Sequence, residues 1–115
     1  MDFKPPRGTL DMLPPEGGRL RALYDAAATL ARRHGFRYVE TPGFESTDLF
    51  AATSGATSDV VSKEMYNFED RSERPLTLRP EGTAPVMRAY LNRRQEQPSP
   101  FKAYYLTRMY RYGRP

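Results

Sequence analysis

The chain has 115 residues, enough for about one small domain, and its net charge of +4 rests on fifteen arginines and only three lysines. This arginine bias favours forked contacts with phosphate or carboxylate groups, although a charge of this size is also ordinary for a soluble domain. Cysteine is absent, which excludes disulfides and thiolate metal sites. No apolar run approaches the roughly twenty residues of a membrane span, and the N-terminus lacks the apolar core of a signal peptide. We therefore expect a cytoplasmic protein without a membrane partner.

The first thirty-five or so residues predict a loop followed by a long helix. Residues 7–15 form an irregular segment bracketed by prolines, whose apolar side chains indicate an ordered loop packed on the domain behind it; a frayed terminus is the alternative. From Glu16, apolar residues recur at spacings of three and four, which predicts an amphipathic helix that Gly35 ends. The predicted inner face consists of Leu20, Leu23, Tyr24, Ala27, Leu30 and Ala31. The single histidine, His34, lies in the last turn, where the helix dipole favours it, and this structural role outweighs a catalytic or metal-binding one.

The middle of the chain predicts a strand, a short helix and a hairpin. Residues 36–40 form the first strand, and Pro42 ends it, because proline cannot donate a hydrogen bond within a central ladder. The position of Pro42 fits either an interface or a plain turn. Residues 44–49 predict a short helix, residues 50–58 a loop rich in small side chains, and residues 59–64 a helical turn. Residues 65–68 and 76–78 then predict an antiparallel hairpin with a charged connector.

The most informative stretch is Leu76 to Tyr90, which reads LTLRPEGTAPVMRAY. A short strand is followed by a polar turn, residues 79–83, and by a helix with Thr83 as the expected N-cap and Pro85 in its first turn. Gly82 allows a close approach of the backbone, so that Glu81 and Thr83 can point together into a cleft and receive a small ammonium-bearing molecule. The alternative is a simple strand-to-helix turn in which both residues only cap the helix. The helix itself is expected to bury Val86, Met87, Tyr90 and Leu91.

The last predicted element, residues 101–112, is rich in aromatic side chains that favour a β-strand. With a period of two, Arg111 lies on one face and Arg108 on the other. An arginine on an apolar strand needs an anionic partner. A protein carboxylate is the favoured partner, and a ligand phosphate is the alternative.

Four separated stretches resemble one family: RGTLDMLP at residues 7–14, VETPGFE at 39–45, KEMY with Phe68 at 63–68, and LRPEGTA at 78–84. Together, in this order and at natural spacing, they are similar to the N-terminal part of histidyl-tRNA synthetase, a class II aminoacyl-tRNA synthetase. The resemblance covers essentially the whole chain. It implies a mixed α+β fold: a class II antiparallel sheet with flanking helices, which residues 1–115 would form only in part, from motif 1 to the start of motif 2.

The resemblance also implies roles for individual residues. Pro42 matches the motif 1 proline at the dimer interface, which favours the interface and implies a homodimer. Glu81 and Thr83 match positions that receive the α-amino group of the substrate histidine. Arg111 matches the catalytic motif 2 arginine that binds the α-phosphate of ATP. The implied reaction is the ATP-dependent formation of histidyl-adenylate, followed by transfer of the histidyl group to tRNA(His). Mg²⁺ would accompany ATP, and no metal ligand is assigned in this chain.

Two positions depart from the family pattern. Motif 2 usually carries a glutamate two residues after its arginine, where it helps to recognise adenine, and here that position is Gly113. The loop that begins at Phe50 lacks the arginine that often follows, and Ala52 cannot supply its charge. The chain also stops within motif 2 and shows no anticodon-binding domain. We therefore expect an N-terminal fragment of the catalytic domain that does not aminoacylate tRNA by itself.

Two other functions compete with this interpretation. The regulatory subunit of ATP phosphoribosyltransferase, a protein of histidine biosynthesis, resembles the same domain without charging tRNA, but its members tend to lose the Glu-Gly-Thr pattern that residues 81–83 retain. A stand-alone basic nucleic-acid-binding domain is the third possibility, and it predicts strongly salt-dependent binding of tRNA.

Overall fold

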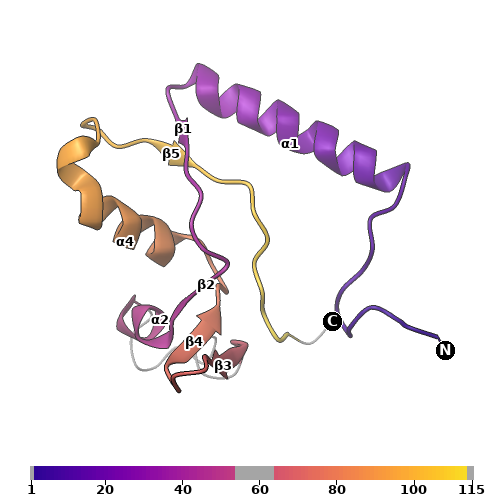
Figure 1. Cartoon of the computed structure of the whole chain (residues 1–115). Coiled ribbons are helices and arrows are strands. Elements are labelled where there is room, and N and C mark those ends of the chain that lie inside the picture. Colours follow the sequence, from indigo (N-terminus) through magenta and orange to yellow (C-terminus); the bar gives the residue numbers. More distant parts are fainter. Residues whose placement is uncertain (1, 54–63, 114–115) are drawn as a thin grey trace.

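The computed structural model describes residues 2–53 and 64–113. Its elements are two main helices, two shorter ones and five short strands (Figure 1). In chain order they are α1 (Glu16–Arg33), β1 (Arg37–Tyr38), β2 (Phe44–Ser46), α2 (Thr47–Thr53), β3 (Asn67–Glu69), β4 (Pro75–Leu78), α4 (Thr83–Arg93), the 3₁₀ turn η1 (Arg94–Glu96) and β5 (Ala103–Tyr104). The mixed α+β class predicted from the sequence is confirmed.

Helix α1 begins and ends close to where its sequence pattern predicts. Glu16 lies in its first turn and two arginines in its last, which suits the helix dipole. Gly35 follows the C-cap with a φ of +80°, a conformation that glycine adopts without strain. The Gly35 N–H donates to the Arg32 carbonyl and the Phe36 N–H to the Ala31 carbonyl, both at 3.0 Å. This pair of bonds is the Schellman arrangement that ends many helices.

His34 has the structural role expected of it. It is the C-cap residue of α1, and its Nδ1 lies 2.9 Å from the Leu30 carbonyl oxygen, to which the ring N–H donates. The segment before the helix is held mainly by its backbone: the Gly17 N–H donates to the Leu13 carbonyl at 2.9 Å. A Cβ at Gly17 would lie 2.5 Å from the Met12 carbonyl oxygen. The side chains of Leu10 and Leu13, however, are exposed, so the prediction that they pack on the domain is wrong.

The three-stranded antiparallel sheet has the order β2-β4-β3. The predicted hairpin is confirmed as β3 and β4, with Phe68 opposite Leu76. Residues 44–49 do not form the predicted helix as a unit: residues 44–46 are strand β2, and the helix α2 starts at Thr47. The physical reason is pairing, because β4 offers a free edge along which Phe44 lies opposite Leu78. The predicted loop at 50–58 begins as the end of α2, and its part from residue 54 onward lies outside the described residues, as do residues 59–63 of the turn predicted at 59–64.

The two strands predicted at residues 36–40 and 101–112 are longer than the strands found in the structure. Strand β1 contains two residues rather than five, and it pairs in parallel with β5, which is also two residues long. Beyond Tyr104 the chain continues past the turn that precedes α4 without joining the sheet (Figure 1). In place of a ladder it makes isolated backbone bonds, from Tyr110 N–H to the Arg79 carbonyl at 2.9 Å and from Tyr112 N–H to the Glu64 carbonyl at 2.7 Å. A strand needs a partner strand along its length, and this segment meets turns instead.

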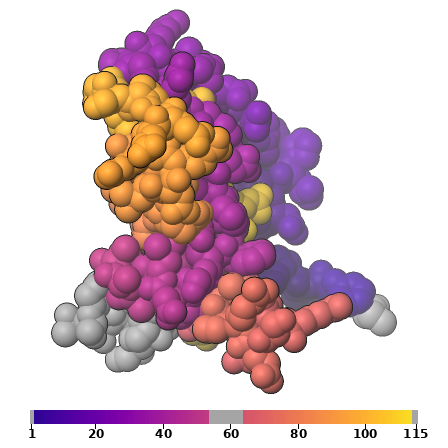
Figure 2. Space-filling view, turned by 60° about the vertical axis from the view of Figure 1, so that its left-hand side comes forward, coloured from indigo at the N-terminus to yellow at the C-terminus, as the bar shows by residue number. Residues whose placement is uncertain are grey.

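The buried core lies where α2 packs on α4 and on strands β2 and β4, and Figure 2 shows these two helices stacked above the β3–β4 hairpin. Phe50 and Ala84 are its buried hydrophobic residues, and Thr77 is fully buried with its hydroxyl 2.8 Å from that of Thr47. Helix α4 buries Ala84 and Pro85, whereas Met87 and Leu91 are exposed, contrary to prediction.

The long apolar faces of α1 and α4 are therefore largely uncovered. Leu23 and Leu30 of α1 are also exposed, and α1 has no buried residue. The radius of gyration is 16.8 Å, compared with about 13 Å for a compact domain of this length. The periodicity predicts the helices correctly, but not which of their apolar residues become buried within these 115 residues. In the part of the chain that the structure describes, no helix has the length and apolar character needed to cross a membrane.

Candidate functional site

The polar turn at residues 79–83 connects β4 to α4 and forms one wall of the candidate site. Pro80 and Gly82 are buried in it. Gly82, not Thr83, is the N-cap residue, with φ −106° and ψ −15°, so the predicted N-cap is wrong by one position. A Cβ at Gly82 would lie 2.6 Å from Cζ and 2.8 Å from the hydroxyl oxygen of Tyr105. The sequence needs glycine here because the Tyr105 ring lies against the backbone.

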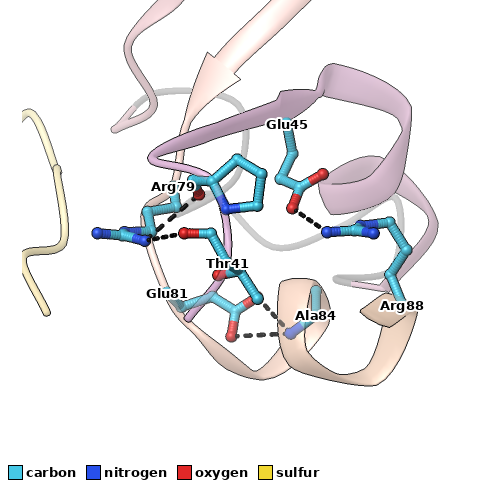
Figure 3. A network of polar contacts seen from close by, with 7 residues as sticks. Thr41, Glu45, Arg79, Glu81, Ala84 and Arg88 are labelled. Carbon is cyan, nitrogen blue, oxygen red and sulfur yellow. Dashed lines mark hydrogen bonds and ion pairs between the residues drawn. The ribbon is translucent and has the colours of Figure 1, made fainter. Parts of the chain in front are cut away.

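The Glu81 carboxylate is turned onto the first amide groups of α4 (Figure 3). It accepts hydrogen bonds from the Thr83 N–H at 2.5 Å and from the Ala84 N–H at 3.0 Å. A carboxylate is favourable here because the N-terminus of a helix carries partial positive charge. The capping role that the sequence left open for Glu81 is thus present in the structure. The Thr83 side chain is exposed next to it.

Arg111 is tied to the same turn. Its Nε donates to the Pro80 carbonyl oxygen at 2.7 Å, so the partner of this arginine is a main-chain carbonyl rather than the carboxylate favoured from the sequence. Among the described residues, the two terminal nitrogens of the guanidinium have no hydrogen-bond partner. A side chain that is fixed through Nε and presents both terminal nitrogens is well suited to hold an anion.

A cleft of about 860 Å³ opens beside Arg111. It is lined by residues 6–9, Glu64, Tyr66, Leu78 and residues 109–113. Arg7 therefore reaches the same cleft as Arg111, from the opposite end of the sequence. Glu81 and Thr83 are not among the lining residues; they lie beside the cleft, joined to it through Pro80. Sequence reasoning did not assign Arg7 a role, although it stands at the start of a motif, because only the fold brings residues 6–9 beside residues 109–113.

Arg79 is a second feature that sequence reasoning missed. It is buried, with 7% of its surface exposed. Its guanidinium donates to the main-chain carbonyls of Thr41 at 3.0 Å, Pro42 at 3.3 Å and Arg108 at 2.8 Å, and to the Thr107 hydroxyl. Figure 3 shows the contact with Thr41 beside the Glu81 turn. The only sequence signal was a charged residue directly after an alternating strand.

An ion pair fixes the other side of α4. Arg88 Nη2 lies 2.7 Å from the Glu45 Oε1 of strand β2, and the Glu45 side chain is only 9% exposed, compared with 32% for Arg88 (Figure 3). Within the described residues, the Arg88 Nε is buried without a hydrogen-bond partner. The pair locks the helix that carries the Glu81 cap onto the sheet.

Pro42 lies between β1 and β2, outside either strand, and it is exposed. This agrees with the prediction that it cannot belong to a central ladder. Its surface position leaves the predicted interface role open, while its carbonyl is held from inside by Arg79.

The groups whose pKa is shifted lie away from the cleft. Backbone hydrogen bonding from Arg74 lowers the pKa of Asp70 in the β3–β4 turn. At the end of α4, the hydrogen bond between Arg93 and Glu96 lowers the pKa of the Glu96 carboxyl and raises that of the Arg93 guanidinium. In the described ranges, no group of three or more acidic or histidine side chains is arranged to hold a metal ion.

The comparisons with known proteins agree with this fold. A solved structure of apo histidyl-tRNA synthetase from S. aureus superposes with a TM-score of 0.81 at 40% sequence identity, over 96% of this chain and 30% of that one. A structure from Bacillus halodurans, titled an ATP phosphoribosyltransferase regulatory subunit/histidyl-tRNA synthetase, has a TM-score of 0.80 at 23% identity, over 96% of this chain and 28% of that one, which supports the fold alone. The fold is therefore that of a class II aminoacyl-tRNA synthetase.

The sequence comparisons identify the family. The family model described as histidyl-tRNA synthetase matches residues 8–114. The histidine–tRNA ligase of Natranaerobius thermophilus is 50% identical over 113 residues, which are 97% of this chain and 27% of that protein. The chain belongs to the histidyl-tRNA synthetase family. It spans about a quarter of the length of this relative.

Proposed function

We propose that this chain supplies part of the ATP and histidine site of a histidine–tRNA ligase. The complete enzyme would activate histidine to histidyl-adenylate with ATP and transfer the histidyl group to tRNA(His). The observation that carries the proposal is the 2.7 Å bond from Arg111 Nε to the Pro80 carbonyl. It joins the arginine expected to bind phosphate to the turn expected to bind the amino acid, at the edge of a cleft of about 860 Å³.

The chemistry requires two anions to meet. An oxygen of the histidine carboxylate attacks the α-phosphorus of ATP, the bond from that phosphorus to the bridging oxygen of pyrophosphate breaks, and pyrophosphate leaves. Negative charge accumulates on the phosphoryl oxygens during this step, and a fixed guanidinium stabilises it. Arg111 fits this role because Nε is already bound, which leaves a planar pair of terminal nitrogens for two oxygens of one phosphate.

Glu81 and Thr83 would position the amino acid. An ionised carboxylate has about four acceptor sites, and the Thr83 and Ala84 amides occupy only some of those of Glu81. The remaining sites can accept hydrogen bonds from the α-ammonium group of histidine, with the exposed Thr83 hydroxyl beside it. Holding the ammonium group in this way directs the carboxylate toward phosphate, which is catalysis by positioning.

The same proposal includes the remaining partners. ATP would bind together with Mg²⁺, but the described residues do not form a magnesium site, so no step here depends on the metal. Pro42, exposed on the surface, would contribute to the interface of a homodimer. We place the complete protein in the cytoplasm, where its tRNA substrate is.

The test uses a complete synthetase in which residues 1–115 have this sequence, called the complete enzyme below. Glu81→Gln keeps one side-chain oxygen that can still accept a capping bond, but it removes the charge and replaces the other acceptor oxygen with an NH₂ donor. We expect the KM for histidine in histidine-dependent exchange of pyrophosphate into ATP to rise about tenfold to a hundredfold, the loss of one hydrogen bond to a charged group. The KM for ATP should change little.

Arg111→Lys should lower kcat instead, because a lysine cannot present two parallel donors. Glu96→Ala is the matched control: this exposed glutamate lies in η1, beyond the end of α4 that is far from Glu81, and pairs with Arg93, so the kinetics of this variant should equal those of the wild type. An unchanged KM for histidine in Glu81→Gln would contradict the proposed site. A wild-type enzyme without any exchange would contradict the proposed function and favour a regulatory relative.

A further inference from the structure

Arg79 is a buried charge whose hydrogen-bond acceptors are neutral. Four oxygens accept from it: the main-chain carbonyls of Thr41, Pro42 and Arg108, and the Thr107 hydroxyl. A buried ion is costly to desolvate, and neutral acceptors return less than a carboxylate would. What the guanidinium adds is direction, since its five N–H groups point along fixed lines in one plane.

Arg79 thereby joins three segments that are distant in sequence: its own turn and the two segments that its guanidinium contacts. One is the segment before β2, which also receives the Arg79 N–H at the Gly43 carbonyl at 3.0 Å. The second is the turn that continues into Pro80 and Glu81. The third is the segment from Thr107 onward, which returns a bond from the Tyr110 N–H to the Arg79 carbonyl at 2.9 Å. Both the backbone and the side chain of Arg79 therefore form hydrogen bonds with the first and the third segment.

The third segment is the one that delivers Arg111. It is not part of the sheet, so no strand ladder sets its position. Between Tyr104 and Arg111 its position relative to the Glu81 turn depends on the Arg79 contacts, on the Tyr105 ring against Gly82 and on the bond from Arg111 Nε to the Pro80 carbonyl. A shift here would move the phosphate-binding side chain relative to the amino-acid-binding one.

We propose that Arg79 is a positioning residue for histidine activation, which sets the distance between the Glu81 turn and Arg111. This inference rests on the proposed function, and it assigns a role to a residue that touches neither ligand. Histidine and ATP bind in the reactive orientation only when the Glu81 turn and Arg111 are at the correct distance from each other. Misplacement by about 1 Å in such a site can cost on the order of a hundredfold in rate.

The test compares Arg79→Lys and Thr107→Val in the complete enzyme. Lysine keeps the charge and loses the planar set of donors, whereas Thr107→Val removes one acceptor and leaves Arg79 in place. Arg74→Lys is the matched control, because Arg74 is also a hydrogen-bonded arginine but lies on the exposed β3–β4 turn, paired with Asp70. Active sites are counted by the burst of adenylate formation, so that every rate refers to folded, competent enzyme.

We expect Arg79→Lys to lower kcat/KM per counted site by tenfold or more for both histidine and ATP, and Thr107→Val to lower both by a smaller factor. The double variant should be no worse than Arg79→Lys, since both changes break the same contact. Arg74→Lys should match the wild type. If Arg79→Lys fails to fold, Thr107→Val still gives the test.

The kinetics distinguish a failure of this inference from a failure of the proposed function. Wild-type kinetics per counted site in Arg79→Lys and Thr107→Val, with only the number of active sites or the melting temperature reduced, would show a purely structural role and overturn the inference while the proposed function stands. A wild-type enzyme that performs no exchange would overturn the proposed function, and this inference with it.

Discussion

Replacing Gly82 by alanine tests whether the Tyr105 ring sets the geometry of the turn. The backbone angles of Gly82, φ −106° and ψ −15°, are accessible to alanine, so the substitution introduces no backbone strain. The added Cβ, however, would lie 2.6 Å from Cζ and 2.8 Å from the hydroxyl oxygen of Tyr105. Real Cβ atoms do not approach other atoms so closely, and either the ring or the turn must move.

The expected cost follows from two opposing terms. Alanine in place of glycine reduces the freedom of the unfolded chain and stabilises by about 0.4 to 1 kcal/mol when its conformation fits. Overpacking of a filled site costs about 1 to 3 kcal/mol. The net change in the free energy of unfolding is therefore a loss of up to about 2.6 kcal/mol, with a midpoint of about 1.3 kcal/mol. Since the turn carries Glu81, the KM for histidine should rise as well.

Gly18→Ala is the matched control, because nothing lies within 4 Å of a Cβ at that position in α1. It should stabilise by about 0.5 to 1 kcal/mol, since glycine is a poor residue inside a helix. Thermal unfolding of the complete enzyme, followed by scanning fluorimetry, should rank Gly18→Ala above the wild type and Gly82→Ala below it. Tyr105→Leu removes the distal ring atoms, so in that background Gly82→Ala should cost much less. An equal loss in both backgrounds would refute the role given to Tyr105.

Two further predictions concern contacts outside the cleft. Glu45→Ala leaves the partly buried Arg88 without its partner and should destabilise by about 1.5 to 3 kcal/mol in thermal or urea unfolding; the exposed Glu96→Ala should have little effect, and equal losses would refute the difference in burial. Asp70 accepts hydrogen bonds from Arg74, which lower the pKa of its carboxyl below the ordinary 3.8. A lowered pKa means that its stabilising contribution is complete above the ordinary value and is lost as the pH falls through the folded-state value. The melting temperature of the wild type should therefore exceed that of Asp70→Asn near neutral pH and converge with it in acid; a constant difference would contradict the argument.

The sequence predicts those parts of the fold that depend on neighbouring residues. Helix α1 and its end at Gly35 follow from local periodicity and a positive φ, and the β3–β4 hairpin follows from alternation on either side of a short connector. The failures depend on distant partners. Residues 44–46 become a strand because β4 lies beside them, and residues after Tyr104 leave the sheet because they meet turns.

The candidate site shows the same division. The motif resemblance selects Glu81, Thr83 and Arg111, and the structure brings Arg111 to the Glu81 turn through Pro80. Arg7 and Arg79 could not be found in this way. Arg7 matters only because the fold places residues 6–9 in the cleft, and the role of Arg79 lies in acceptors up to 38 positions away in the sequence. Every residue has a backbone carbonyl, so contacts with these groups produce no side-chain pattern from which the sequence could predict them.

Capping and ligand binding by Glu81 are parts of one arrangement. A free glutamate side chain would lose rotamer freedom when it binds an ammonium group, and that loss would weaken binding. Here the bonds from the Thr83 and Ala84 amides already hold the carboxylate, so its ordering is completed during folding rather than during binding. Gly82 fits into this arrangement only because it has no side chain, since the Tyr105 ring lies directly against its backbone. A helix cap thus becomes a preorganised binding group.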